Sequence, residues 1–161
     1  MRSGPSADKA ANGTGHTGGA AGLQRFVIEV ETRGNTSVTD LTGKVRDKLS
    51  ALPAAKTGGV VHLFVVGSTA GLSTMEYEPG LVNHDLKHTL QRLVPDDARY
   101  DHESTWNDDN GHSHIRATFI GPDLTIPFAE GGELLTGTWQ QIVLLDFDTR
   151  PRLRTIIGTV L

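Results

Sequence analysis

The chain has 161 residues, no cysteine and a formal net charge of −4 at pH 7. This length suits one domain, and the lack of cysteine excludes disulfides, thiolate metal ligands and cysteine nucleophiles. The 15 basic and 19 acidic residues are interspersed, which argues against a general nucleic-acid-binding protein. No apolar run approaches the roughly 18 residues of a membrane helix, and no secretory signal is visible near the start. We therefore expect a cytoplasmic protein without nucleic-acid or membrane partners.

The first half of the chain combines strand and helix patterns. Residues 1–22 hold no large apolar side chain and predict a flexible extension that precedes a domain over 23–161. Alternating apolar residues over 26–31 predict a strand. Thr39 resembles an N-cap and begins a helical pattern that runs to Leu52. The β-branched residues over 60–66 predict a buried strand.

The second half begins with a Gly-rich loop over 67–71 and ends in strand patterns. Pro79 suits the first turn of a second helix, which ends before Pro95. The further strands are expected over 72–77, 115–120, 124–128, 138–147 and 153–161. Because the last strands follow without a helix between them, we expect them in meander order. The pattern predicts an α+β fold, a single domain with a largely antiparallel sheet or sandwich and two helices.

The most informative segment spans residues 100–116 and holds three of the seven histidines. If the segment enters a strand at His114, then His112, His114 and Arg116 share one face. His102 would return to them through a loop. Neutral imidazoles with nearby carboxylates are common ligands of divalent metals. Zinc is the metal that we expect first at such a site. The alternative is a polar loop with surface histidines.

Other candidates lie in the loop and beside it. Ser68 and Thr69 offer hydroxyls that could hold phosphate, although a tight turn would need the same glycines. Glu76 could act as a base or a ligand, or lie on a solvated strand face. Asp85 points either into a cleft or to solvent from the second helix. Gln140 lies in a stretch that forms either core or a pocket wall.

Read together, these pieces resemble the YjbQ-like family, often labelled secondary thiamine-phosphate synthase, over about residues 23–161. The most specific blocks are L-x-G-T-W-Q and H-x-H-I-[KR]-A in this order. The resemblance rests on G-S-T-A-G-L-S-T-M-E-Y-E-P-G-L at 67–81, D-L at 85–86, D-H-E at 101–103, G-H-S-H-I-R-A at 111–117, I-G-P-D-L-T-I-P-F at 120–128, G-E-L-L-T-G-T-W-Q-Q-I-V-L-L-D-F-D at 132–148 and R-P-R-L-R at 150–154.

The resemblance implies a compact α+β homotrimer with a site near its acidic and histidine residues. Positions that the family usually keeps are Glu76, Asp85, His102 and His114, and Trp139 and Gln140 match the G-T-W-Q block. Many members have histidine where this chain has Gly67. If that histidine acts in its relatives, His112 or Glu78 is the substitute here.

Three functions follow. The family label implies the joining of a pyrimidine pyrophosphate to a thiazole phosphate, which would need groups that hold the leaving pyrophosphate. The second is a metal-dependent hydrolase or lyase that acts on a small phosphorylated or carbonyl compound, and the third is a trimeric binding protein without catalysis. In the catalytic hypotheses Asp85 is the expected general base, with Glu76 and His114 beside it. Arg116, Ser68, Thr69 and Gln140 would bind the substrate and its phosphate.

Overall fold

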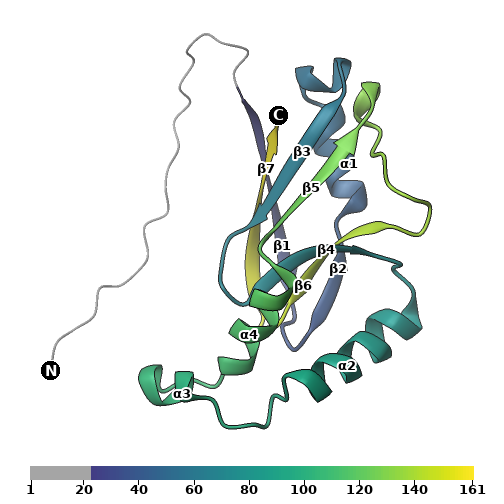
Figure 1. The fold of residues 1–161 in the computed structure, drawn as a ribbon. Coiled ribbons are helices and arrows are strands. Elements are labelled where there is room, and N and C mark those ends of the chain that lie inside the picture. The colour runs from purple at the N-terminus through teal and green to yellow at the C-terminus, as the bar shows by residue number, and fades with distance from the viewer. Residues whose placement is uncertain (1–22) are drawn as a thin grey trace, which may run out of the picture.

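The computed structural model describes residues 23–161, so the predicted extension over residues 1–22 lies outside the described residues. The described chain forms two antiparallel sheets and four α-helices (Figure 1). This confirms the α+β class and the antiparallel pairing predicted from the sequence. The structure has two more helices than predicted, and both lie in the segment that holds His102, His112 and His114.

The larger sheet has strand order β1-β7-β3-β5. Its inner face is built by every second residue of each strand, which is the pattern of a sheet with one covered face. On β1 these residues are Phe26, Ile28 and Val30, which are all buried. The four strands are β1 (Gln24–Thr32), β7 (Arg152–Val160), β3 (Gly59–Val65) and β5 (Asp123–Phe128).

The smaller sheet has strand order β2-β6-β4, and its central strand is buried on both faces. Ile142 and Leu144 face the larger sheet in one apolar cluster, whereas Val143, Leu145 and Phe147 face the helices in another. The three strands are β2 (Ser37–Asp40), β6 (Gln141–Asp146) and β4 (Ala70–Met75).

The first helix, α1 (Thr42–Ser50), packs into the cluster between the sheets through Leu41, Val45 and Leu49. Asp40 Oδ1 accepts the Thr42 N–H at 2.8 Å, so an aspartate satisfies this helix end. The cap predicted at Thr39 is wrong, because Thr39 belongs to β2. A short turn of 3-10 helix, η1 (Pro53–Lys56), follows α1, and a second, η3 (Glu130–Gly132), follows β5.

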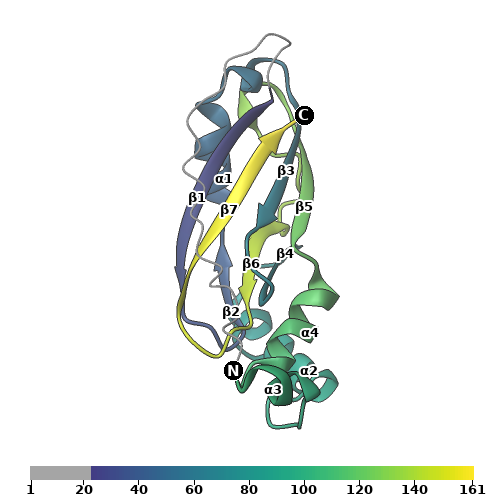
Figure 2. The same cartoon turned by 90° about the vertical axis from the view of Figure 1, so that its left-hand side faces the viewer.

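The other helices gather at the end of the molecule away from the C-terminus (Figures 1 and 2). Leu90 and Ala117 from this group pack on the outer face of β6. No helix within residues 23–161 has the length and apolar character needed to cross a bilayer. The group comprises the π-turn η2 (Leu81–Asp85), α2 (Leu86–Leu93), α3 (Asp101–Trp106) and α4 (Gly111–Ile120).

The strand predicted over 115–120 is wrong, because these residues belong to helix α4. In a helix, residues four apart share a face, and His112 and Arg116 are both buried by this spacing. Ile115 and Phe119 point outward. The alternation I-R-A-T-F is too short to separate a period of two from a helical face.

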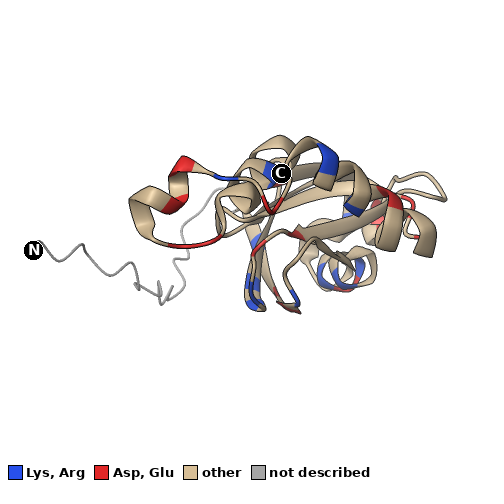
Figure 3. Ribbon diagram, turned by 90° about the horizontal axis from the view of Figure 1, so that it is seen from below, with Lys and Arg blue, Asp and Glu red and all other residues tan. Residues whose placement is uncertain are grey.

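The meander predicted for the last strands is also wrong. Strand β5 pairs with β3, β6 lies in the other sheet, and β7 pairs with both β1 and β3. Long-range pairing of this kind leaves no local signal in the sequence. Acidic and basic residues are scattered over the ribbon, and the charged residues of α3 are all acidic (Figure 3).

Candidate functional site

The loop between β3 and β4 brings a glycine and two hydroxyls to the end of the sheets. Gly67 has a backbone φ of +122°, a conformation that residues with a Cβ atom rarely adopt. A Cβ at Gly67 would lie 2.9 Å from Arg154 Nη1, so the guanidinium occupies the space of the missing side chain. Ser68 is exposed, whereas Thr69 is buried.

A buried network fixes the position of that guanidinium. Arg154 donates from Nε and Nη2 to the two oxygens of Asp146, both at 2.7 Å, and from Nη2 to Thr69 Oγ1 at 2.8 Å. Thr69 in turn donates to Asp148 Oδ2 at 2.9 Å, and Arg152 donates to both oxygens of Asp148. Two carboxylates therefore balance two guanidinium groups.

Asp148 remains ionised in this setting. Burial alone would raise the pKa of its carboxyl, but hydrogen bonds from Arg152 and Thr69 outweigh it and lower the pKa. Nε and Nη2 of Arg154 are committed to the network, and Nη1 makes no hydrogen bond within residues 23–161. Nη1 is thus a free donor beside Gly67.

Two histidines meet near this loop. The rings of His102, from α3, and His114, from α4, have centroids 4.5 Å apart. Asp108 Oδ1 lies 3.4 Å from His102 Nε2, and Asn110 lies at 3.2 Å from the same nitrogen. Both histidines are half-buried.

The surroundings of His114 lower the pKa of its imidazole, which favours the neutral form. Burial lowers the pKa of its imidazole, and the neighbouring His102 lowers it further, while Asp108 and the backbone of Ser68 act in the opposite direction. The interaction with Ser68 places His114 against the β3–β4 loop. A neutral imidazole here can accept a proton or donate one N–H.

His112 does not join this pair. Residues two apart in a helix project roughly 200° apart, so His112 and His114 face different sides of α4. His112 is 4% exposed, its Nε2 lies 3.3 Å from Ser113 Oγ, and its Nδ1 is buried and has no hydrogen-bond partner among residues 23–161. Burial, with a smaller contribution from Arg116, lowers the pKa of His112.

Arg116, expected to bind phosphate, is 3% exposed and is used inside the protein. It donates from Nε and Nη2 to Val94 O, from Nη1 to Thr36 Oγ1 at 2.9 Å, and from Nη2 to Gln91 Oε1 at 2.9 Å. These contacts join α4 to the end of α2 and to the β1–β2 turn. The prediction that His114 and Arg116 share one face is wrong, because it assumed that this segment forms a strand.

The remaining candidates lie elsewhere. Glu76 follows the end of β4 that pairs with Gln141, which is the end remote from the β3–β4 loop. Gln140 lies at the same end and donates to Thr74 Oγ1 at 2.9 Å. Asp85 ends η2 and is exposed. The structure therefore brings Ser68 and His114 together but not these three.

Neither proposed substitute for a histidine at position 67 faces Gly67. His112 is turned into the interior, and the Glu78 carboxylate accepts the N–H groups of Gly80 and Leu81 at the start of η2. Arg154 Nη1 is the group that lies there. Asp146, Asp148 and Arg154 were missed as site residues, although D-F-D and R-L-R place charges two apart in strands that are otherwise apolar.

The described residues do not provide the ligand set that the expected metal would need. Within residues 23–161 no group of three or more His, Cys, Asp or Glu side chains is arranged to hold a metal ion. Structural and catalytic zinc sites use at least three protein ligands. His102, His112 and His114 do not form such a set within residues 23–161 of one chain.

Comparison with known proteins agrees with this architecture. The family model described as UPF0047 protein YjbQ-like matches residues 26–161. UPF0047 protein Rv2556c of Mycobacterium tuberculosis is 38% identical over 122 residues, which cover 76% of this chain and 86% of the relative. UPF0047 protein YjbQ of Salmonella typhimurium is 35% identical over 74% of this chain and 85% of its own length.

Solved structures agree as well. The hypothetical protein APE1520 from Aeropyrum pernix has a TM-score of 0.76 and 31% identity, covering 86% of this chain and 98% of that chain. An uncharacterised YjbQ/UPF0047 protein from Clostridium acetobutylicum has a TM-score of 0.73 and 26% identity, with 84% and 99% coverage. The match of the family model and the similarity of these relatives show that the chain belongs to the UPF0047, YjbQ-like family.

Proposed function

We propose that the protein is an enzyme that binds a small phosphorylated compound between the β3–β4 loop and the His102–His114 pair. The observation that carries this proposal is the free Nη1 donor of Arg154 at Gly67, beside an exposed Ser68 hydroxyl and a neutral His114. Donors that are fixed before the ligand arrives stabilise developing negative charge at low reorganisation cost. The buried Asp146 and Asp148 fix this donor through Arg154 and Arg152.

The reaction implied by the family resemblance fits such a site. A thiazole nitrogen would use its lone pair to form a C–N bond to the pyrimidine methylene. The C–O bond to pyrophosphate would break, and its electron pair would leave with the pyrophosphate. Arg154 Nη1 and the Ser68 hydroxyl would donate to that leaving group, and the neutral His114 would donate one N–H. No base is needed, because the attacking nitrogen carries no proton.

The lowered pKa of His114 favours a second candidate, a hydrolase or lyase that acts on a small phosphorylated compound. A neutral imidazole can remove a proton from water or from a carbon beside a carbonyl group. His114 would then be the base in place of Asp85, which is exposed on η2. Ser68 and Arg154 would keep their role toward the phosphate.

One experiment separates these candidates. The protein is mixed with the pyrimidine pyrophosphate, with and without the thiazole phosphate, and both pyrophosphate and organic products are measured. Release that requires the thiazole supports the transferase, and release without it supports the hydrolase. If His114→Gln releases pyrophosphate as fast as the wild type in every mixture, His114 has no part in the chemistry. His88→Gln, an exposed histidine on α2, is the matched control. Zinc added to parallel reactions tests the expected metal.

We also propose that the chain forms a homotrimer, as the resemblance implies. Support comes from the outer face of the larger sheet, where Val27, Ile157 and Phe64 are cross-strand neighbours in one row. Val27 is 49% exposed and Phe64 is 42% exposed. Exposed apolar rows of this kind favour burial against another surface, and a second copy of the chain is the partner that we propose.

A further inference from the structure

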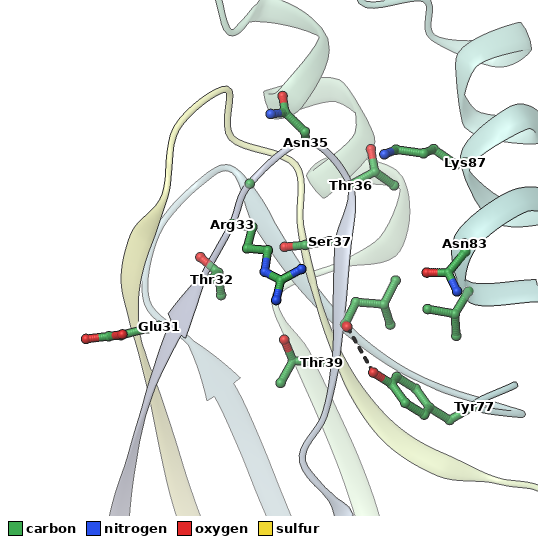
Figure 4. Close-up of a pocket in the computed structure, with 13 residues that line it drawn as sticks. Glu31, Thr32, Arg33, Asn35, Thr36, Ser37, Thr39, Tyr77, Asn83 and Lys87 are labelled. Atoms are coloured by element: carbon green, nitrogen blue, oxygen red, sulfur yellow. Dashed lines mark hydrogen bonds between the residues drawn. The ribbon is translucent and has the colours of Figure 1, made fainter. Parts of the chain in front are cut away.

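A cavity of about 560 Å³ lies between the β1–β2 turn with its flanking strands and the segment that runs from Tyr77 into α2 (Figure 4). Its wall contains no residue of the β3–β4 loop and neither His102 nor His114. We propose that this cavity is a second binding site, which takes a small organic molecule that bears a phosphate group. This assignment goes beyond the proposed function and does not depend on it.

Two cations from different elements supply the charge. Arg33, after β1, reaches inward between β1 and β2 toward Ser37 and Thr39, and Lys87, on α2, extends toward Thr36 (Figure 4). Among the described residues neither cation forms an ion pair with a carboxylate. An arginine fork and a lysine point charge are a common combination for phosphate.

The acidic residue of the cavity does not compete with this charge. Glu31 is the one carboxylate that the described residues contribute to the wall, and its side chain points away from Arg33 (Figure 4). The two inward cations therefore face a space without a counter-charge among the described residues. A negative ligand group would supply that charge.

Ser37 adds an unpartnered polar atom to the wall. Its Oγ is buried and has no hydrogen-bond partner in the described part of the chain. A buried hydroxyl without a partner costs roughly 1–3 kcal/mol. Because that oxygen is buried, a ligand oxygen would pair with it after a local rotation of the Ser37 side chain, which lies beside Arg33 in Figure 4.

The rim of the cavity is a strained turn. Gly34, Asn35 and Thr36 all have positive φ, at 68°, 51° and 60°, and positive φ at a β-branched residue such as Thr36 is a genuine outlier. Arg116 Nη1 donates to Thr36 Oγ1 at 2.9 Å, and Asn35 N donates to Asp148 O at 2.7 Å. Strain that neighbouring groups maintain in this way is concentrated at ligand sites.

The cavity is larger than a phosphate group needs. Its volume falls within the roughly 300–1,000 Å³ of pockets for small molecules, so an organic body can enter with the phosphate. Val38, Val82 and the ring of Tyr77 supply apolar wall for that body. The Tyr77 hydroxyl donates to Val38 O at 3.3 Å, which holds the ring at the edge of the cavity.

Calorimetric titration tests the assignment, with adenosine monophosphate as the phosphate-bearing probe, adenosine as the uncharged analogue, and inorganic phosphate as the anion alone. The wild type should bind the monophosphate more tightly than either of the other two. Arg33→Gln and Lys87→Gln should each weaken its binding at least about tenfold, which is the loss of one charge-assisted contact. Ser37→Ala should weaken it less.

The controls locate the site. Arg25→Gln on β1 and Arg92→Gln on α2 remove the same charge from residues outside the cavity wall and should bind as the wild type does. Ser68→Ala and His114→Gln should also keep this binding, which separates it from the proposed active site. Thermal melting of each variant confirms folding. The assignment is overturned if the wild type binds none of the probes at millimolar concentration, if adenosine binds as well as its monophosphate, or if all charge variants lose affinity equally.

Discussion

Arg154 binds Asp146 through two parallel hydrogen bonds, Nε to Oδ2 and Nη2 to Oδ1, both 2.7 Å long. The Arg154 side chain is 7% exposed and that of Asp146 is fully buried. A fork-to-fork pair fixes the plane of the guanidinium, and Nη1 is thereby directed at Gly67. The charge pair inside the protein thus determines what the β3–β4 loop can offer to a ligand.

Removing one partner of this pair should be costly. Asp146→Asn removes the negative charge that pairs with the buried positive charge of Arg154. We therefore expect a loss of about 3–5 kcal/mol in the free energy of unfolding. Urea denaturation measures it, and Asp47→Asn on the exposed face of α1 is the control. The double variant Asp146→Leu, Arg154→Met should lose less than the sum of its two single variants. Additive losses would show that the pair is not coupled.

Gly67→Ala should destabilise the protein, because its φ is +122° and a Cβ would meet a guanidinium that cannot move freely. We expect a loss of roughly 1–3 kcal/mol. Gly43→Ala is the matched control, since Gly43 lies in α1 and a Cβ there meets nothing within 4 Å. That change should stabilise by about 0.5–1 kcal/mol. Equal thermal shifts for the two variants would contradict the geometry of the loop.

His112 should make stability depend on pH. Its pKa in the folded protein lies below the 6.5 of a free histidine because of burial. The unfolded chain therefore takes up the proton first as pH falls, so stability declines below about pH 6.5. Asp148, whose pKa is also lowered, stays ionised over this range. Urea midpoints between pH 7.5 and 5.5 should fall less for His112→Gln than for the wild type. His84→Gln, exposed on η2, should keep the wild-type slope.

The outer row of the larger sheet should control assembly. Phe64→Asp places a charge in this row, beside Ile157, and should reduce the mass measured by light scattering from three chains to one at micromolar concentration. Leu135→Asp puts the same charge on an exposed residue outside the sheets and should leave the mass unchanged. A wild-type protein that is already a monomer would contradict the trimer.

The sequence predicted the fold where patterns are long. Phe26, Ile28 and Val30 on β1, and Leu41, Val45 and Leu49 around α1, are buried as their spacing indicated. The segment at His114 was assigned wrongly, because six residues of alternation fit a helical face as well as a strand. Strand β2 was missed, since S-V-T-D is short and polar and pairs only with β6.

Only part of the candidate site could be predicted, because some of its residues meet through long-range packing that leaves no local signal. Ser68, His102 and His114 could be named from local motifs, and they lie together. Arg154 and Asp146 lie on strands of different sheets, and their meeting depends on how those sheets pack. Arg116 was expected at the site because an assumed strand placed it on the face of His114. Helix α4 instead turns Arg116 inward, where Val94, Thr36 and Gln91 accept hydrogen bonds from all three of its nitrogens.

We propose that the His102–His114 pair and the β3–β4 loop bind the phosphorylated ligand. Nitrogen-15 NMR of the histidine rings, recorded during a titration with pyrophosphate, tests it directly. The resonances of His102 and His114 should shift with saturation, and those of His84 and His88, paired on the exposed side of η2 and α2, should not. Unchanged spectra of His102 and His114, or equal shifts at all four rings, would contradict the account.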